Sequence, residues 1–392
     1  MDFQLTKEQR DIQQAAREFV QAEYDKDKVM QLELNHEYPT ELWKKSCQQG
    51  FLGIDFPDEY GGQGYGLMET VLVQEEFARQ FGGIGLAVVS TNMGAATIFQ
   101  NGTEEQKKKY LPPIFNGEAH IATAVSEPDH GSDITFLDTS AVKDGEDYVI
   151  NGVKTFITNA NIAKWTIILC QTNPEAKPGY RGQTNIIVEM DRPGIELSDL
   201  QKMGWKSAPT FQVFLTNVRV PQENLLGEEN RGFYQFLRMG NNFRVQAGAT
   251  ALGMAQGAFD RALDYAKTRE AFGQKIGKFQ VIQHKLVDMF TKVETARLVV
   301  YKAASEIGQG RTDPTLCSMA KWYPCRMAVE VCDEAIEILG GHGYMLENEV
   351  ERFYRDAKAA EIADGMREIQ KNTIATALLG KELTRIRPEE SK

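Results

Sequence analysis

The fold is decided between residues 120 and 227, by the runs HIATAV (120–125), DYVING (147–152), KTFIT (154–158), WTIILC (165–170), TNIIVEM (184–190) and FQVFLTNVRV (211–220). The turn dipeptides DG (144–145) and NG (151–152), together with Pro178 and Pro193, separate these runs. Short β-rich runs between such turns are typical of a small antiparallel barrel or sandwich. The sequence therefore predicts a β-domain in the middle of the chain.

The segments on either side of this β-domain have helical patterns. Near the start, Thr6 and Gln9 fit a capping box that begins a helix. After residue 230, helical patterns cover residues 233–267, 279–307 and 314–339, and long helices with few breaks favour a four-helix bundle. We therefore predict a multidomain α+β protein with an N-terminal helical domain (1–118), a middle antiparallel β-barrel or sandwich domain (119–229) and a C-terminal four-helix-bundle domain (230–392).

The composition of the 392 residues argues against several classes of protein. A net charge of −11 lacks the excess of Lys and Arg that a nucleic-acid surface needs. No apolar stretch approaches the roughly 20 residues that span a bilayer, and the acidic, polar start is unlike a signal peptide, so we expect a cytoplasmic location. The five cysteines have no CxxC spacing, so they indicate neither a disulfide framework nor a zinc site, and we predict no metal site. They are Cys47, Cys170, Cys317, Cys325 and Cys332.

The usual catalytic motifs do not occur in the sequence. There is no HExxH, no GxSxG, no Walker A sequence and no complete GxGxxG after a strand. The near match GGHGYM (340–345) follows a helical pattern, which makes it a helix end by local pattern and not a phosphate loop. A bound dinucleotide would therefore not use the Rossmann arrangement.

Three other stretches carry polar residues in loops. AVSEPDHGSDI (124–134) places two serines in a loop after a strand, and TREAFGQKIGKFQVIQHKLVDM (268–289) places an arginine and a glutamine between two helices. YRDAKAAEIADGMREIQ (354–370) places Asp364 and Gly365 before a helix, where backbone N–H groups and an acid can converge on a ligand. Taken singly, the stretches are explained as a polar turn, a solvated helix–loop–helix and an N-terminal helix cap at Asp364.

Together and in this order, the stretches resemble the acyl-CoA dehydrogenase family along nearly the whole chain. The matching blocks are LTKEQR (5–10), EPDHGSD (127–133), INGVKTFITN (150–159), TREAFGQKIGKFQ (268–280), ILGGHGY (338–344) and YRDAK (354–358). The resemblance implies an FAD-dependent enzyme that removes a proton and a hydride from adjacent carbons of an acyl-CoA. It also implies a homotetramer, a dimer of dimers, with an electron-transfer flavoprotein as the usual electron acceptor.

The resemblance also implies which residues bind FAD. Arg269, Phe272 and Gln280 match a segment that reaches the FAD of a neighbouring subunit, and an arginine can pair bidentately with a pyrophosphate. Glu337 stands where relatives often have Gln, and a carboxylate there would be repelled by an anionic cofactor unless it is protonated or turned away. The other positions that match FAD contacts are Val125, Ser126, Phe156, Thr158, Gly340, Gly341 and Met366.

The resemblance places CoA and the catalytic base as well. Ser132 and Arg244 match residues that contact CoA, with Arg244 a plausible partner for the 3′-phosphate end, while Asn241 replaces an acidic residue common in relatives. Asp364 matches the glutamate that most relatives use to remove the α-proton. The other known position of the base holds Phe243, so Asp364 is the only good candidate, and burial would raise its pKa toward neutrality.

The residues around the base bear on the acyl group. Many relatives have Tyr-Glu where this chain has Ala363 and Asp364, next to Gly365, so an aromatic ring and one methylene are missing. This predicts a branched or alicyclic acyl group, for example cyclohexanecarboxyl-CoA. The alternatives are a short-chain, butyryl-type enzyme in which Met366 refills the space, an enoyl-CoA reductase, an oxygen-using flavin oxidase, and a family member that binds acyl-CoA without turnover.

Overall fold

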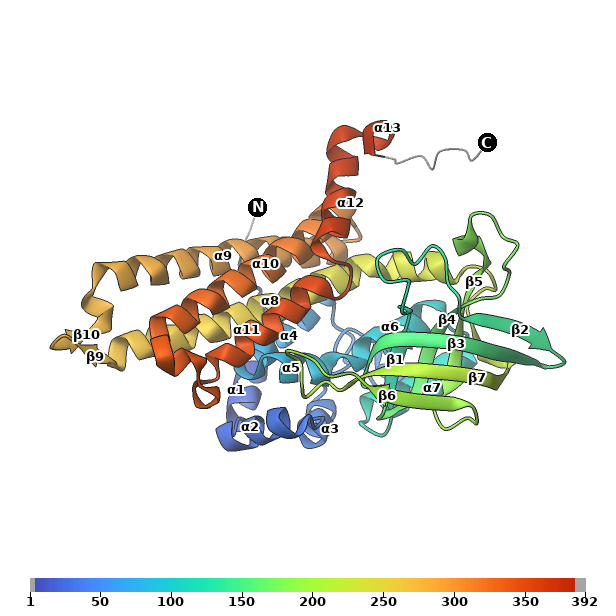
Figure 1. Cartoon of the computed structure of the whole chain (residues 1–392), viewed down its shortest axis with the longest axis horizontal. Helices are drawn as coiled ribbons and strands as arrows, with labels where there is room; N and C mark the ends of the chain where they lie inside the picture. The colour runs from blue at the N-terminus through green and yellow to red at the C-terminus, as the bar shows by residue number, and fades with distance from the viewer. Residues whose placement is uncertain (1–3, 385–392) are drawn as a thin grey trace. The chain divides into compact units, whose positions relative to one another are not determined.

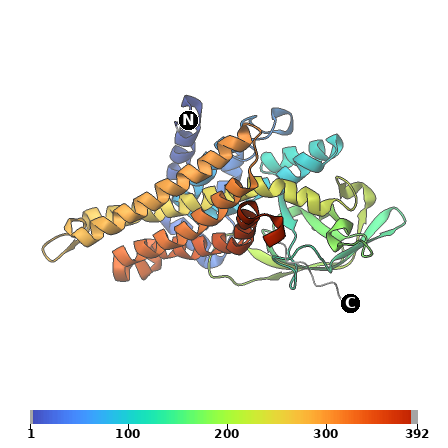
Figure 2. The same ribbon diagram turned by 90° about the horizontal axis from the view of Figure 1, so that it is seen from above.

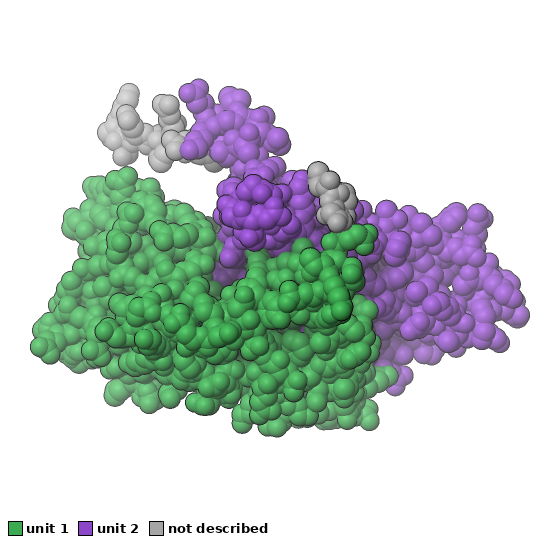
Figure 3. Space-filling model, turned by 180° about the vertical axis from the view of Figure 1, so that it is seen from behind, with its two compact units in different colours: residues 1–73, 83–240 green, residues 74–82, 241–392 purple. Residues whose placement is uncertain are grey.

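The computed structural model describes residues 4–384 and divides into two compact units, coloured separately in Figure 3. Unit 1 contains Met1–Val73 and Gly83–Gly240, and unit 2 contains Gln74–Gly82 and Asn241–Lys392. The first three and the last eight residues of the predicted outer domains lie outside the described part of the chain. Along the chain, helices precede a sheet and further helices follow it (Figure 1).

The first part of unit 1 is helical. The capping box at Thr6 is confirmed, because the Thr6 hydroxyl accepts the Gln9 N–H at 3.1 Å and the Gln9 side chain accepts the Thr6 N–H at 3.0 Å. The helix α4 (Leu67–Phe81) passes from unit 1 into unit 2. The remaining helices of this part are α1 (Lys7–Ala22), α2 (Lys26–Asn35), α3 (Thr40–Gln48), η1 (Asp58–Tyr60), α5 (Gly83–Val89), α6 (Thr91–Asn101) and α7 (Glu104–Phe115).

The second part of unit 1 is a single sheet. Its strands are β1 (His120–Ala124), β2 (Ser140–Asp144), β3 (Asp147–Thr158), β4 (Ala163–Gln171), β5 (Gln183–Glu189), β6 (Ile195–Asp199), β7 (Thr210–Pro221) and β8 (Leu225–Leu226), with the short helices η2 (Gly179–Gly182) and η3 (Gln222–Asn224) between them. The strand order is β6-β7-β3-β2-β4-β5-β8, and β1 pairs with β4. Closure of this sheet into a barrel or a sandwich stays a prediction.

Two details of the predicted β-domain are wrong. The sheet is not wholly antiparallel, because β1 runs parallel to β4, and a parallel pair needs a long connection, here the segment that contains β2 and β3. The dipeptide at 151–152 does not form a turn, since β3 continues through it with a shift of register between Ile150 and Gly152. A side chain at Gly152 would meet the Thr139 backbone at 2.6 Å, so the glycine permits close approach of two chains.

Both faces of the central strands are buried, because successive side chains of a strand point to opposite sides. Ile168 and Ile186 belong to one apolar cluster of the sheet, with Tyr148 and Val213. Their neighbours in sequence lie in a second cluster that joins the sheet to α6 and α7, with members that include Ile98, Tyr110, Leu111, Ile114, Trp165, Ile167 and Ile187. The helical layer and the sheet of unit 1 therefore share one core.

Unit 2 is built from long helices. The three predicted helices are confirmed to within one residue, as α8 (Gly232–Thr268), α9 (Gln280–Gly308) and α10 (Pro314–Leu339). The helix α10 packs against α9, α11 (Val350–Ile362) and α12 (Arg367–Leu379), an arrangement visible in Figures 1 and 2. The short elements are β9 (Glu270–Ala271), β10 (Gln274–Lys275), η4 (Ile276–Lys278), η5 (Gly340–Tyr344), η6 (Leu346–Asn348) and α13 (Lys381–Thr384). The four-helix bundle stays a prediction.

Two general expectations can be compared with the structure. All five cysteines are buried and free in the structure. Among the described residues, no helix combines the length and the apolar character that crossing a membrane requires.

Candidate active site

The loop that follows β1 is held by a buried ion pair. The Lys154 ammonium donates to the Val125 carbonyl at 2.9 Å and to the Glu127 carboxylate at 2.8 Å. Glu127 also accepts the backbone N–H groups of Asp138 and Thr139. Although burial by itself would raise the pKa of Glu127, the charge of Lys154 and these hydrogen bonds hold that pKa below its ordinary value. Both ends of the loop are therefore fixed to the sheet.

The predicted FAD residues of unit 1 lie next to one another, directly after β1 and on β3. The Thr155 N–H donates to the Ser126 carbonyl at 2.9 Å, and the pairing of β3 with β7 is irregular between Lys154 and Ile157. Phe156 lies in this irregular segment with a φ of 60°, uncommon for an aromatic residue, and its side chain is 69% exposed. Thr158 is half-buried at the end of the strand. The bulge thus presents an aromatic ring outside the sheet.

A hairpin joins α8 to α9 and carries the predicted cross-subunit residues. Phe272 and Gly273 have φ angles of 52° and 76°, as the two central residues of a type I′ turn require. The Phe272 side chain is 94% exposed. No residue of the described chain pairs with the Arg269 guanidinium, and Gln280 is the first residue of α9. The hairpin therefore presents an aromatic ring and an unpaired cation.

The glycines after α10 leave their main chain open. The helix ends at Leu339 and Gly340 has a φ of 60°, so the interpretation of this motif as a helix end is confirmed. A methyl group added at Gly340 or Gly341 would meet no described atom within 4 Å. Glu337 is exposed on the last turn of the helix. A ligand can therefore approach this backbone without meeting a side chain of the glycines.

The predicted CoA residues do not lie on one element. Ser132 is exposed in the loop after β1, in unit 1. Arg244 lies in α8, in unit 2, and its Nη1 donates to the Asn241 Oδ1 at 2.8 Å. Burial lowers the pKa of the Arg244 guanidinium, which nevertheless stays charged at any physiological pH. Because Asn241 is neutral, it orients this guanidinium without cancelling the charge that an anionic ligand would need. Phe243, at the alternative position of the base, is buried and apolar.

Asp364 lies in the short loop between α11 and α12. Asp364 and Gly365 have φ angles of 53° and 85°, a left-handed region that few residues other than glycine adopt without strain. The Gln370 side chain donates to the Gly365 carbonyl at 3.0 Å. The residue that precedes α12 is Met366, with no side-chain cap. The helix-cap explanation of Asp364 is therefore wrong, because its carboxyl satisfies no N–H group at the start of α12.

Asp364 is exposed as a residue, whereas protein groups surround its carboxyl. The residue is exposed, as a group that meets a substrate must be. Burial raises the pKa of the Asp364 carboxyl, and the positive charge of Lys321 opposes that effect. Its backbone N–H donates to no acceptor within the described chain. Ala363, on the other side of the base, is half-buried.

Sequence reasoning missed the buried charges that support these loops. Lys154 and Lys321 are both fully buried, and neither was a candidate. A signal existed for Lys321, because it interrupts an otherwise apolar face of α10 with a charge. Within unit 2, the hairpin that carries Arg269 lies far along α8 and α9 from the loop that carries Asp364 (Figures 1 and 2). One chain therefore does not bring these two residues together.

Comparisons with known proteins define the class. Family models for the N-terminal, middle and C-terminal domains of acyl-CoA dehydrogenases match residues 6–118, 122–218 and 230–379. The probable acyl-CoA dehydrogenase YngJ of Bacillus subtilis is 40% identical over 97% of this chain and 100% of its own length. The cyclohexane-1-carbonyl-CoA dehydrogenase of Geobacter metallireducens is 37% identical over 88% of this chain and 90% of its own. The butyryl-CoA dehydrogenase structure from Megasphaera elsdenii, 35% identical, superposes with a TM-score of 0.92 over 97% of this chain and all of that one.

These findings define an FAD-dependent oxidoreductase with helical N- and C-terminal domains and a central sheet. The chain belongs to the acyl-CoA dehydrogenase family. The described residues fit FAD, since the Phe156 ring is displayed outside the sheet, the Arg269 guanidinium is unpaired and the main chain at Gly340 is open. These are an apolar surface, a cation and a bare backbone, which suit a flavin ring, a pyrophosphate and a close approach.

Proposed function

We propose that this protein dehydrogenates an acyl-CoA between its α and β carbons, giving the 2-enoyl-CoA, with Asp364 as the base. The observation that carries the proposal is Asp364 itself, an exposed residue in a loop whose carboxyl has a raised pKa and does not cap α12. Anaerobic mixing with a panel of acyl-CoAs tests it, because oxidation of the substrate bleaches the visible band of bound flavin. A flavin that no acyl-CoA bleaches would contradict the proposed reaction and favour a non-catalytic family member.

The side chain and the backbone N–H of Asp364 have separate roles in the proposed reaction. The ionised Asp364 carboxylate accepts the α-proton of the thioester, at hydrogen-bond reach. When bound, FAD supplies the acceptor for the hydride that leaves the β-carbon. The unused Asp364 N–H is suited to the thioester oxygen, where negative charge develops as the proton leaves. Ser132 and Arg244 hold the CoA portion, with Arg244 as the cationic partner of a phosphate.

The FAD site is proposed to involve two subunits of a homotetramer. Val125, Ser126, Phe156 and Thr158 take part in one chain, and a neighbouring chain contributes Arg269, Phe272 and Gln280. Gly340, Gly341 and Met366 are the other proposed FAD contacts. The separation of the hairpin from the Asp364 loop within one chain supports this division. Exposed apolar side chains along α9 also support association, among them Val281, Val287, Phe290 and Leu298.

We expect the purified protein to bind about one FAD per subunit noncovalently and Arg269→Met to weaken that binding by about 10- to 100-fold, as loss of a charge-assisted hydrogen bond predicts. Flavin fluorescence measures the affinity, and light scattering measures the mass. Lys267→Met is the matched control, because Lys267 is an exposed cation two residues away on the same helix end. Equal affinities in the two variants, or a monomer that binds FAD tightly, would contradict the shared site.

An electron-transfer flavoprotein is the proposed electron acceptor. A relative from Acetobacterium woodii, 37% identical over 94% of this chain, is a subunit of a caffeyl-CoA reductase-Etf complex. The name of that relative also keeps the reverse reaction, reduction of an enoyl-CoA, as a second candidate. Reoxidation of the acyl-CoA-reduced protein by a purified electron-transfer flavoprotein tests the partner, and incubation of chemically reduced protein with enoyl-CoA tests the direction.

The proposed substrate is an acyl-CoA that is branched or alicyclic near the α-carbon, such as cyclohexanecarboxyl-CoA. Asp364 is shorter by one methylene than the glutamate of many relatives, which withdraws the carboxyl by roughly 1.5 Å. Ala363 beside it lacks an aromatic ring. A thicker acyl group restores contact with the base, and the relative that acts on cyclohexane-1-carbonyl-CoA supports this choice.

We expect kcat/KM for cyclohexanecarboxyl-CoA to exceed that for butyryl-CoA by at least about tenfold, with isobutyryl-CoA between them, which is the range that pocket fit supplies. Ala363→Tyr should reduce this preference, because the ring refills the space beside the base. Steady-state assays with the three thioesters measure the ratios. A clear preference of the wild-type protein for butyryl-CoA would identify a short-chain enzyme, in keeping with the butyryl-CoA dehydrogenase among its structural relatives.

A further inference from the structure

The loop between α11 and α12, residues 363–366, carries Asp364 in a conformation that needs support. Asp364 and Gly365 both have left-handed φ angles, which a residue other than glycine keeps only where the surrounding structure holds it. The Gln370 side chain holds the Gly365 carbonyl from within α12. That hydrogen bond joins the loop to the helix after it and not to the helix before it. A restraint that spans the whole loop has to join the ends of α11 and α12.

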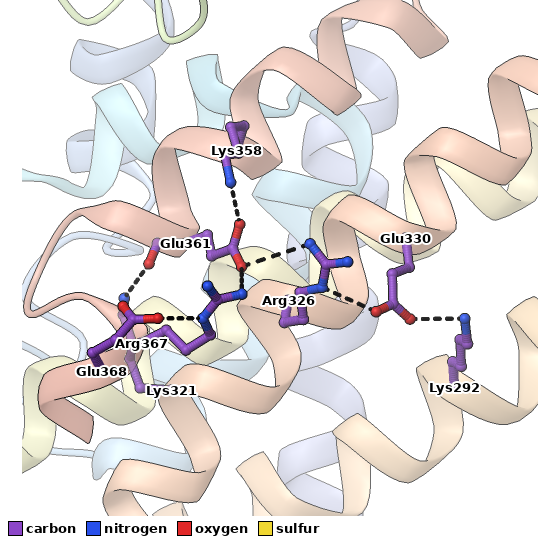
Figure 4. Close-up of polar contacts among 8 residues, drawn as sticks. All are labelled: Lys292, Lys321, Arg326, Glu330, Lys358, Glu361, Arg367 and Glu368. Atoms are coloured by element: carbon purple, nitrogen blue, oxygen red, sulfur yellow. Dashed lines mark hydrogen bonds and ion pairs between the residues drawn. The ribbon is translucent and has the colours of Figure 1, made fainter. Parts of the chain in front are cut away.

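Glu361 and Arg367 flank the loop with charges that their own helices disfavour. Glu361 lies in the last turn of α11, where the helix dipole opposes an anion. Arg367 is the first residue of α12, where the dipole opposes a cation. The two side chains meet across the loop, because the Arg367 Nη1 donates to the Glu361 Oε1 at 3.0 Å (Figure 4). Each charge therefore offsets the unfavourable position of the other.

The Glu361 end of this pair is fixed to α10. Its side chain is 4% exposed, and the Arg326 guanidinium of α10 lies 3.8 Å from the carboxylate. The Lys321 ammonium, fully buried in the same helix, donates to the Glu361 backbone carbonyl at 3.2 Å. The Lys358 ammonium, one turn earlier in α11, lies 2.6 Å from the carboxylate. Arg367 therefore binds a group that α10 and α11 hold in place from several sides.

The pair of Glu361 with Arg367 is the contact that joins α11 to α12 among the described residues drawn in Figure 4. Glu368 pairs with Arg367 at 2.8 Å, but both belong to α12. Glu330 pairs with cations of α10 and α9. Glu330 and Glu368 are 37% and 52% exposed, so solvent screens their pairs more than it screens the pair of the buried Glu361. Neither of these two carboxylates spans the loop.

We propose that Glu361 is a positioning residue for Asp364, because its ion pair with Arg367 closes the loop between α11 and α12 and sets where the Asp364 side chain lies. The inference rests on the proposed role of Asp364 as the base. Loss of the pair leaves both helices packed against α10, but it lets the start of α12 move relative to the end of α11. Proton transfer requires hydrogen-bond reach, and a displacement of about 1 Å costs up to about 10²-fold in rate.

The test compares Glu361→Met, Arg367→Met and Arg367→Lys in the FAD-loaded protein. The first removes the anion, the second removes the cation, and the third keeps the cation. We expect flavin reduction at saturating acyl-CoA to slow by at least about tenfold in both Met variants, while Arg367→Lys keeps most of the wild-type rate. The double Met variant should be no slower than the slower single variant, since both substitutions remove the same interaction.

Glu330→Met is the matched control, because it removes a carboxylate from the same charged group without touching the loop. Its rate of flavin reduction should equal that of the wild-type protein. FAD content and acyl-CoA affinity should stay near the wild-type values in every variant, so that the effect lies in the reduction step and not in binding. A substitution that only destabilised the fold would lower FAD content and the unfolding midpoint as well.

Hydrogen–deuterium exchange gives a readout that needs no substrate. The backbone amides of residues 362–366 should exchange faster in Glu361→Met and Arg367→Met than in Glu330→Met or the wild-type protein, because the open loop loses protection. Wild-type rates of flavin reduction in both Met variants would overturn the proposal, as would rate losses that add in the double variant. Arg367→Met decides alone if Glu361→Met does not fold, since the Arg367 side chain is 37% exposed and its loss costs the fold little.

Failure of the proposed function has a different signature. In that case no acyl-CoA reduces the wild-type flavin, while the exchange of residues 362–366 still reports whether the pair of Glu361 with Arg367 closes the loop.

Discussion

Asp364→Asn is expected to slow the reduction of bound FAD by an acyl-CoA about 10²-fold or more. The amide is nearly the same size as the carboxyl, so the loop between α11 and α12 keeps its shape, but an amide does not accept a proton in this range of pH. FAD content and acyl-CoA affinity should stay close to those of the wild-type protein. Anaerobic stopped-flow absorbance of the flavin band measures the rate, and equilibrium titration measures the affinity.

Glu368→Gln is the matched control for this variant. Glu368 is an exposed carboxylate in the first turn of α12, four residues from Asp364, and it pairs with Arg367 at 2.8 Å. Its replacement by an amide makes the same chemical change in the same part of the chain and should leave the rate unchanged. Near-normal reduction in Asp364→Asn would show that another group is the base.

The pH dependence adds a second measurement. Since burial raises the pKa of Asp364, its ionised fraction falls at a higher pH than that of an ordinary aspartate. The rate should therefore fall as pH decreases through this raised pKa. This decrease in rate at low pH should be absent from the residual activity of Asp364→Asn, because the amide does not titrate.

Lys154→Met is expected to lower the free energy of unfolding by about 3–5 kcal/mol, the usual cost when one partner of a buried ion pair is removed. The Lys154 and Glu127 side chains are 0% and 2% exposed. Methionine fills most of the volume but leaves the Glu127 carboxylate buried beside two N–H donors only. The substitution should also loosen the loop after β1, because the Val125 carbonyl loses its hydrogen-bond donor. Denaturant unfolding followed by circular dichroism measures the change.

Lys143→Met separates this effect from the general loss of a lysine. Lys143 lies on β2 and pairs with Glu229 at 2.9 Å, but half of its side chain is exposed. Exposed pairs contribute about 0–1 kcal/mol, so this variant should unfold near the wild-type midpoint. Adding Glu127→Gln to Lys154→Met should recover stability, since the unpaired charge is then gone. Equal unfolding midpoints for Lys154→Met and Lys143→Met would mean that the buried ion pair stabilises the fold no more than the exposed pair does.

The Lys154 pair also predicts an acid limit of stability. The pKa of Glu127 is lower in the folded chain than the value of about 4.3 expected when it is unfolded. The stabilisation that ionised Glu127 contributes is therefore complete above the unfolded pKa and is lost as pH falls through the lower, folded pKa. Unfolding midpoints measured below pH 4 should decrease less in Lys154→Met than in the wild-type protein.

Local patterns in the sequence determined the helices, and the resemblance to the family indicated the candidate base. The three long helices were predicted to within one residue, because a helix depends on a short-range period and on residues at its ends. The DG turn between β2 and β3 was predicted for the same reason. Asp364 is the candidate that the resemblance offers, because the family places the base at one of two positions and the other position holds Phe243 in this sequence.

Only the tertiary structure decided which strands pair and which charges meet. The dipeptide at 151–152 continues a strand because Thr139 packs against Gly152, and β1 finds a parallel partner in β4, which follows only after β2 and β3. Lys154 meets Glu127, 27 residues away, and Lys321 meets the carbonyl of Glu361, 40 residues away. No local pattern reports such pairs, because their free energy depends on burial and on groups that folding alone brings within a few ångströms.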